Sequence, residues 1–115
     1  MGFYQALKTL SGGRISVAAR SVGLAQAALE EALQYSKQRK QFGRPISEFQ
    51  LIQLKLVEMA IKVEAARLLA YKAAWKKSTG QDYVLEASMA KVYASRISRE
   101  VANEALQIFG GYGYT

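Results

Sequence analysis

Positive charge and aromatic rings gather in one short stretch of the sequence, residues 37–50, which reads KQRKQFGRPISEFQ. Arginine offers a rigid fork of donors that suits phosphate oxygens, glutamine adds a neutral polar partner, and phenylalanine gives a flat apolar wall. The set of Arg39, Gln41 and Phe42 therefore indicates an anion-binding site. The alternative is an ordinary helix end, where cations favour the negative end of the dipole, a glycine turns the chain and a proline blocks further helix. The residues alone leave both interpretations open.

A second segment with possible binding chemistry closes the sequence, QIFGGYGYT at residues 107–115. Gly110 and Gly111 are typical of a helix C-terminal cap. Glycines also let a backbone lie close against a ligand, and the two tyrosines that follow supply ring surfaces. The segment is not a GxGxxG dinucleotide fingerprint, and no strand precedes it.

A third segment, SGGR at residues 11–14, is expected at the N-terminus of the first long helix. Free backbone amides at such a terminus can bind an anion. Arg14 could hold a phosphate or a carboxylate, although a surface salt bridge is the more frequent role for an arginine.

Several kinds of chemistry have no candidate residues. The chain has no cysteine and no histidine, which excludes disulfides and thiolate sites and argues against a zinc centre or a hydrolytic triad. Glu30 and Glu31 are adjacent and splay apart. The remaining helical glutamates sit among cations as solvated partners, so we expect no catalytic residue and no metal site.

Three long helices must position these segments. A stripe of apolar residues at spacings of three and four predicts a helix from about Gly13 to Lys40. A capping box, SEFQ, predicts a second helix that begins at Ser47 and ends near residues 76–80, and Asp82 is the expected N-cap of the third. The inner face of the third helix should carry Ala87, Ala90, Ala94, Ile97, Val101, Ala105 and Ile108.

The expected fold is all-α, an antiparallel up-down bundle, because the connections between successive helices are short. The middle helix has one apolar stripe from Ile52 to Ala66 and another through Leu54, Ile61, Ala65 and Leu68. A helix that is apolar on two faces is expected to be covered from two sides. A fourth helix from elsewhere in a longer chain, or from another copy, would supply that cover.

Composition bounds the class of protein. The 115 residues are enough for one domain. Their net charge of +7 makes a nucleic-acid partner worth considering. The cations are nevertheless spread along the chain, and long antiparallel rods do not form a helix-turn-helix, so we expect no nucleic-acid partner. No apolar run is long enough for a membrane span, and we identify no secretory signal.

The residues from Gly13 to Ala60, GRISVAARSVGLAQAALEEALQYSKQRKQFGRPISEFQLIQLKLVEMA, closely resemble the start of the C-terminal helical domain of acyl-CoA dehydrogenases. ALQIFGGYGYT resembles the flavin-contacting segment of the same family, and the likeness covers essentially the whole chain. The resemblance implies three helices of a four-helix bundle, with the N-terminal and middle domains and the last helices absent. It further implies oxidation of acyl-CoA to 2,3-enoyl-CoA with FAD, electron transfer to an electron-transfer flavoprotein, and a homodimer or homotetramer.

The resemblance also implies roles for individual residues. Those expected at the FAD pyrophosphate, or lining the site around it, are Arg39, Lys40, Gln41, Phe42, Phe49 and Gln50. Those expected against the adenosine portion in a neighbouring subunit are Gln107, Ile108, Phe109, Gly110 and Gly111. Those expected near the acyl-CoA are Ser11, Gly12, Gly13 and Arg14.

One departure from the family bears on activity. The family's catalytic glutamate lies in most members beyond the segment that matches GGYGYT, and in a minority at the position of Gly13, which has no side chain. The resemblance therefore implies an inactive isolated chain, cytoplasmic in a bacterium or in the mitochondrial matrix of a eukaryote. The alternative from the residues is a helical oligomerisation module that binds no flavin.

Overall fold

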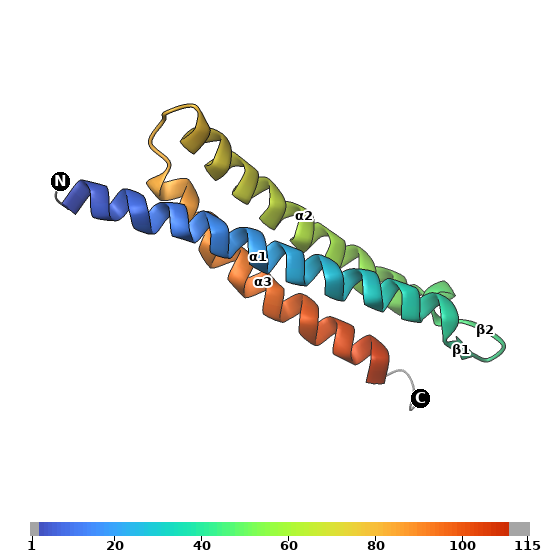
Figure 1. Ribbon diagram of the computed structural model, residues 1–115. Helices are drawn as coiled ribbons and strands as arrows, with labels where there is room; N and C mark the ends of the chain where they lie inside the picture. The colour runs from blue at the N-terminus through green and yellow to red at the C-terminus, as the bar shows by residue number, and fades with distance from the viewer. Residues whose placement is uncertain (1–2, 111–115) are drawn as a thin grey trace.

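The computed structural model describes the backbone of residues 3–110 and the side chains of residues 10–110. It contains three long helices, α1 (Phe3–Gln38), α2 (Gln50–Ser78) and α3 (Val84–Gly110). Two short strands, β1 (Lys40–Gln41) and β2 (Arg44–Pro45), and a 3-10 helix (Ile46–Glu48) connect α1 to α2. The molecule is a rod with extents of 65 × 21 × 16 Å (Figure 1).

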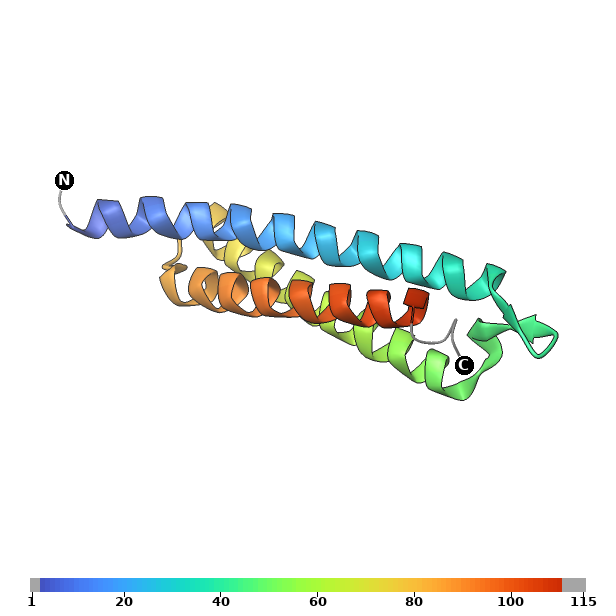
Figure 2. The same cartoon turned by 90° about the horizontal axis from the view of Figure 1, so that it is seen from below.

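The helices run up, down and up, so the predicted all-α antiparallel bundle is confirmed. The helices α1 and α3 lie side by side along most of their length, as both views show (Figures 1 and 2). The helix α2 approaches α1 near the hairpin and diverges from it towards its own C-terminal end (Figure 1). Within the described residues, none of these helices has the length and apolarity needed to cross a membrane.

The core follows the stripes that the sequence predicts for α2 and α3. Every residue predicted for the inner face of α3 is buried, and so is the stripe of α2 from Ile52 to Ala66. Alanine at many of these positions lets the helix backbones approach closely. The large side chains of the second stripe of α2 are uncovered: Leu54 is 54% exposed, Ile61 61% and Leu68 58%, whereas Ala65 is half-buried.

The start of α1 differs from the prediction. The helix begins at Phe3 rather than Gly13, so Ser11–Arg14 lies inside it. The amides of this segment are therefore interior to the helix, and the predicted anion site at a free helix N-terminus is wrong. Each glycine costs a helix only about 1 kcal/mol relative to alanine, which is too little to stop a helix that continues favourably on both sides.

The connection after α1 forms a β-hairpin that the sequence analysis did not predict. The strands β1 and β2 pair antiparallel, with Gln41 opposite Arg44. The two turn residues both have positive φ, 54° at Phe42 and 81° at Gly43. This is the pattern of a type I′ turn, whose twist matches that of the flanking strands.

The predicted capping box at Ser47 does not form. Residues Ile46–Glu48 make a 3-10 turn, and α2 begins at Gln50 with Phe49 as an N-cap that makes no side-chain hydrogen bond. The side chain of Ile46 is only 1% exposed. We attribute the delayed helix start to the burial of this side chain against α1 and α2, which outweighs the capping interaction.

The turn from α2 to α3 follows the prediction. Lys76 and Lys77 lie in the last turn of α2, and Gly80 has a φ of 77°. The Asp82 carboxylate accepts a hydrogen bond from the Val84 amide at 3.2 Å, as expected of an N-terminal cap.

Candidate functional site

The hairpin between α1 and α2 presents uncompensated positive charge. The side chains of Arg39, Lys40 and Arg44 are exposed, and none forms an ion pair with another residue in the described part of the chain. The cations that do pair with glutamates, including Lys55 and Lys76, lie on α2. The charge at the hairpin is therefore available to an external anion.

Aromatic rings accompany these cations. The Phe42 side chain is 85% exposed, and its ring lies edge-on to that of Phe49, with centroids 6.4 Å apart. The guanidinium carbon of Arg44 lies 4.4 Å from the centre of the Phe49 ring, a distance at which a cation and a ring attract each other. Rings and charges together could cover a planar ligand that carries a phosphate.

Backbone hydrogen bonds hold the hairpin against the end of α1. The Arg39 amide donates to the Tyr35 carbonyl at 2.8 Å, and the Arg39 carbonyl accepts from the Ile46 amide at 2.8 Å. Because Ile46 is buried, this arrangement fixes the root of the hairpin. Arg39 therefore projects from a rigid backbone position rather than from a free loop.

The end of α3 lies at the same end of the bundle as the hairpin (Figure 2). The Tyr35 hydroxyl donates to the Phe109 carbonyl at 3.2 Å, and the two rings meet edge to face at 4.9 Å. The Gln107 side chain accepts a hydrogen bond from the Lys55 ammonium at 3.1 Å. Ile108 is fully buried, so it supports this end of the helix rather than facing a ligand with its side chain.

The remaining predicted cofactor residues differ in position and exposure. Gln41 is half-buried in β1, Gln50 is exposed at the start of α2, and Gly110 is the last residue of α3. Gly111 lies outside the described residues.

The predicted substrate residues lie far from the hairpin. Arg14 and Arg39 are 25 positions apart, which corresponds to about 38 Å along α1 at 1.5 Å per residue. The Arg14 guanidinium donates to the Ser88 hydroxyl of α3 at 2.7 Å. A shallow hollow of about 250 Å³ adjoins it, lined by Arg14, Ser88, Lys91 and Val92. One chain therefore does not bring the two groups into a common site.

The other substrate residues differ in accessibility. The Ser11 side chain is buried, and its hydroxyl has no hydrogen-bond partner among the described residues. A Cβ on Gly12 would lie 3.2 Å from the Lys77 ammonium, whereas a Cβ on Gly13 would meet nothing within 4 Å. Gly13 therefore faces open space.

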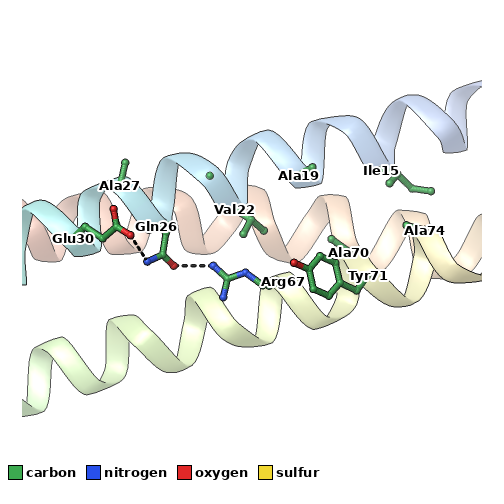
Figure 3. A pocket seen from close by; sticks show the side chains of 11 residues that line it. Ile15, Ala19, Val22, Gln26, Ala27, Glu30, Arg67, Ala70, Tyr71 and Ala74 are labelled. Carbon is green, nitrogen blue, oxygen red and sulfur yellow. Dashed lines mark hydrogen bonds between the residues drawn. The ribbon is translucent and has the colours of Figure 1, made fainter.

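A groove of about 480 Å³ separates α1 from α2 where the two helices diverge (Figure 3). Arg67 reaches across it from α2 and donates to Gln26 of α1 at 2.8 Å, and Gln26 donates to Glu30 at 3.0 Å. Small residues form much of the wall, namely Ala19, Gly23 and Ala27 on α1 and Ala70 and Ala74 on α2. On each helix these small residues recur every four positions, so they lie on one face that a further helix could approach closely. This recurrence is visible in the sequence and could have predicted the groove.

Four glutamates of the helices pair with cations. Within the described residues no cluster of carboxylates suits a metal ion, and Glu64, Glu86, Glu100 and Glu104 each pair with a cation. The pKa of Glu86 is lowered, chiefly by the hydrogen bond from Lys76 and next by a backbone hydrogen bond. These glutamates act as charge partners between or within helices, as the sequence predicts.

Comparison with known proteins identifies the family. The model of the acyl-CoA dehydrogenase C-terminal domain matches residues 1–115. The chain is 57% identical to a 3-(aryl)acrylate reductase of Clostridium sporogenes, over 98% of this chain and 30% of that protein. It is 52% identical to the caffeyl-CoA reductase–Etf complex subunit CarC of Acetobacterium woodii, over 98% of this chain and 30% of that protein.

The fold agrees with these relationships. The structure of butyryl-CoA dehydrogenase from Megasphaera elsdenii superposes with a TM-score of 0.92 at 54% identity, covering 99% of this chain and 30% of that one. The chain thus spans about 30% of the length of the relatives that it matches. It belongs to the acyl-CoA dehydrogenase family and corresponds to the C-terminal helical domain of its members.

Proposed function

We propose that this chain supplies FAD-binding and subunit-interface surface to an acyl-CoA dehydrogenase that oxidises acyl-CoA to 2,3-enoyl-CoA. The observation that carries the proposal is the set of exposed cations at the hairpin, which no carboxylate of the described chain neutralises, beside the exposed ring of Phe42. A diphosphate is the ligand chemistry that such a surface favours, because charge-assisted bonds from arginine are strong and directional.

The proposed FAD contacts fall into two groups, one at the hairpin and one at the end of α3. Arg39 and Lys40 would hold the diphosphate with Gln41, while Phe42 and Phe49 would cover the adjoining rings. The end of α3, from Gln107 onward, would face the adenosine of a cofactor held mainly by another subunit. The bound flavin would supply the hydride acceptor for the oxidation, and Arg14 with its neighbours would lie near the acyl-CoA.

The complete enzyme needs parts that lie outside this sequence. We propose that a fourth helix occupies the groove between α1 and α2, whose small side chains permit close approach. We further propose electron transfer to an electron-transfer flavoprotein, because a relative at 52% identity is named as a subunit of an Etf complex. Since Gly13 has no side chain and no other residue here could act as the base, the isolated chain should not reduce FAD with an acyl-CoA.

Titration calorimetry with FAD tests the cofactor proposal. We expect Arg39→Ala to weaken FAD binding by about tenfold, as the loss of a charge-assisted hydrogen bond implies. The control is Arg20→Ala, because Arg20 is an exposed arginine on α1 far from the hairpin. Equal affinities in the two variants, or an absence of FAD binding by the assembled protein, would refute the proposal.

A second candidate is a helical oligomerisation module without flavin. The observation that favours it is the uncovered apolar stripe of α2, in which Leu54, Ile61 and Leu68 are more than half exposed. Size-exclusion chromatography with detection at a flavin wavelength separates the two candidates. A colourless oligomer that takes up no added FAD would favour this second function.

A further inference from the structure

A lysine of α2 holds two side chains near the end of α3. The Lys55 ammonium donates to the Glu104 carboxylate at 2.9 Å and to the Gln107 side-chain oxygen at 3.1 Å. Glu104 and Gln107 are three positions apart, so they are neighbours on one side of α3. An ammonium has three donors, which lets Lys55 hold both acceptors at once.

This contact determines which atom of the Gln107 carboxamide is available to a ligand. An ammonium only donates, so the atom that faces Lys55 is the oxygen Oε1. The nitrogen Nε2 of the same group makes no hydrogen bond to another described residue, and the side chain is exposed. Gln107 therefore presents a donor, rather than an acceptor, at this end of the bundle.

Lys55 is itself held in place between the two helices. Its side chain is 24% exposed and that of Glu104 is 31% exposed. A free lysine side chain samples many rotamers, and ordering it costs conformational entropy. The ion pair with Glu104 offsets that cost in the folded chain, so the ammonium is already beside Gln107 when a ligand arrives. Such preorganisation strengthens binding, because less has to be ordered in the complex.

The same turn of α3 is held from α1 as well. The helix ends at Gly110, so the Phe109 carbonyl is among the last four, which have no partner within a helix. The Tyr35 hydroxyl donates to this carbonyl at 3.2 Å, and the two rings meet edge to face. The turn that carries Gln107 is thus fixed from both neighbouring helices.

We propose that Lys55 is a positioning residue for the cofactor, which holds the Gln107 oxygen and so directs Nε2 of Gln107 to an acceptor atom of the FAD adenosine. Adenine offers ring nitrogens as acceptors. Lys55 acts through Gln107 and does not contact FAD. This inference rests on the proposed function, in which the end of α3 faces the adenosine.

The chain offers a matched control for this lysine. Lys62 of α2 pairs with Glu100 of α3 at 3.2 Å, and both side chains are part-exposed like those of the Lys55 pair. It lies seven positions further along α2, about two turns. Lys62→Met removes an ion pair between the same two helices and leaves Gln107 untouched. Lys55→Met removes an ion pair together with the contact to Gln107.

Titration calorimetry with FAD on the assembled protein compares these variants. We expect Lys55→Met to weaken FAD binding about fivefold and Gln107→Ala about tenfold, as the loss of one hydrogen bond implies. Lys62→Met should change the affinity by less than about twofold. Lys55→Arg, which keeps a charged donor, should bind FAD more tightly than Lys55→Met. Equal affinities in Lys55→Met and Lys62→Met would overturn the inference.

A double-mutant cycle tests whether Lys55 acts through Gln107. The protein that carries both Lys55→Met and Gln107→Ala should bind FAD no more weakly than Gln107→Ala alone, because the first change then has nothing left to disturb. Multiplied losses would mean that Lys55 contacts FAD directly or acts elsewhere, and would overturn the inference.

The same titrations separate this inference from the proposed function. If the unmodified protein binds FAD and Gln107→Ala weakens that binding, but Lys55→Met does not, the positioning role alone is wrong. If the unmodified protein binds no FAD, the proposed function is wrong and this inference fails with it.

Discussion

At the scale of single residues, Phe42 combines backbone strain with exposure. Its backbone φ is 54°, a value that residues other than glycine, asparagine and aspartate rarely adopt. Its ring is 85% exposed. Folding thus gains little from this ring, and strain that persists without a packing benefit is typical of positions kept for binding.

Replacing this residue should separate stability from binding. Phe42→Asn puts the favoured residue at the first position of a type I′ turn, so we expect the free energy of unfolding to rise by about 1 kcal/mol. Loss of the ring should weaken FAD binding by about two- to tenfold, the range for one aromatic contact. Chemical denaturation and FAD titration of the same protein measure both effects. A less stable Phe42→Asn would show that the ring contributes to packing.

The pH dependence of stability should reveal the Glu86–Lys76 pair. The hydrogen bond from Lys76, at 3.0 Å, lowers the pKa of Glu86 below its value in the unfolded chain. A lowered pKa means that the pair stabilises the fold above the ordinary glutamate range, and that this contribution is lost as the pH falls through the folded pKa.

The variant Glu86→Gln should therefore be less stable than the unmodified chain at pH 7 and should approach it in acid. Thermal unfolding at a series of pH values measures the difference. Glu31→Gln is the control, because Glu31 is exposed and has no ion pair within the described residues. A difference that stays constant from pH 7 to pH 3 would contradict this assignment.

At the scale of elements, α1 continues through Gly12 and Gly13, and glycine inside a helix lowers the free energy of unfolding. Gly13 lies inside the helix with open space where a Cβ would be. We expect Gly13→Ala to raise the free energy of unfolding by about 1 kcal/mol, because alanine loses less backbone entropy in a helix. Chemical denaturation measures the change.

A matched substitution in the hairpin should have the opposite sign. Gly43 also faces open space, but its φ is 81°. Gly43→Ala should therefore destabilise the chain by about 1 kcal/mol, through backbone strain alone. If both variants were destabilised, the description of α1 as continuous from Phe3 would be wrong.

Sequence reasoning succeeded where a pattern is repeated and failed where two local signals compete. Seven periodic positions of α3 agree on one face, and all seven are buried. The capping box at Ser47 was a single local signal, and the burial of Ile46 outweighed it. The hairpin was missed because a phenylalanine at positive φ is outside the residue preferences of a type I′ turn.

The candidate site was predictable in composition but not in arrangement. Arg39 and Phe42 stand out by residue type, and the structure leaves both exposed. Spacing along the chain did not reveal that Tyr35 would bind the end of α3 to the hairpin end of α1. That contact joins two residues 74 positions apart in sequence, and it depends on how α1 and α3 pack.

At the scale of the whole molecule, the described chain has a thin core and an uncovered exterior. Half of the buried apolar residues are alanines, while large side chains such as Leu24, Leu51 and Leu106 are more than half exposed. Alanine buries little apolar area, so the hydrophobic stabilisation per residue is small. A domain of this kind gains much of its stability from whatever covers its exterior.

The thermal stability of the chain should accordingly depend on its concentration. Association that requires the folded state stabilises it by mass action, by about 2.7 kcal/mol at a hundredfold excess over Kd. For a chain of this size we expect Tm to rise by several degrees over a hundredfold range of concentration, at about 4 °C or more per kcal/mol. Calorimetry at a fixed scan rate measures it.

The control places a charge in the second apolar stripe of α2. Leu68 is 58% exposed, so Leu68→Glu should alter the stability of the monomer by no more than about 0.5 kcal/mol. The variant should therefore match the unmodified chain at the lowest concentration and fall below it as concentration rises. If Leu68→Glu kept the same dependence of Tm on concentration, the stabilising association would use another surface, and the exposed side of α3 would be the next to test.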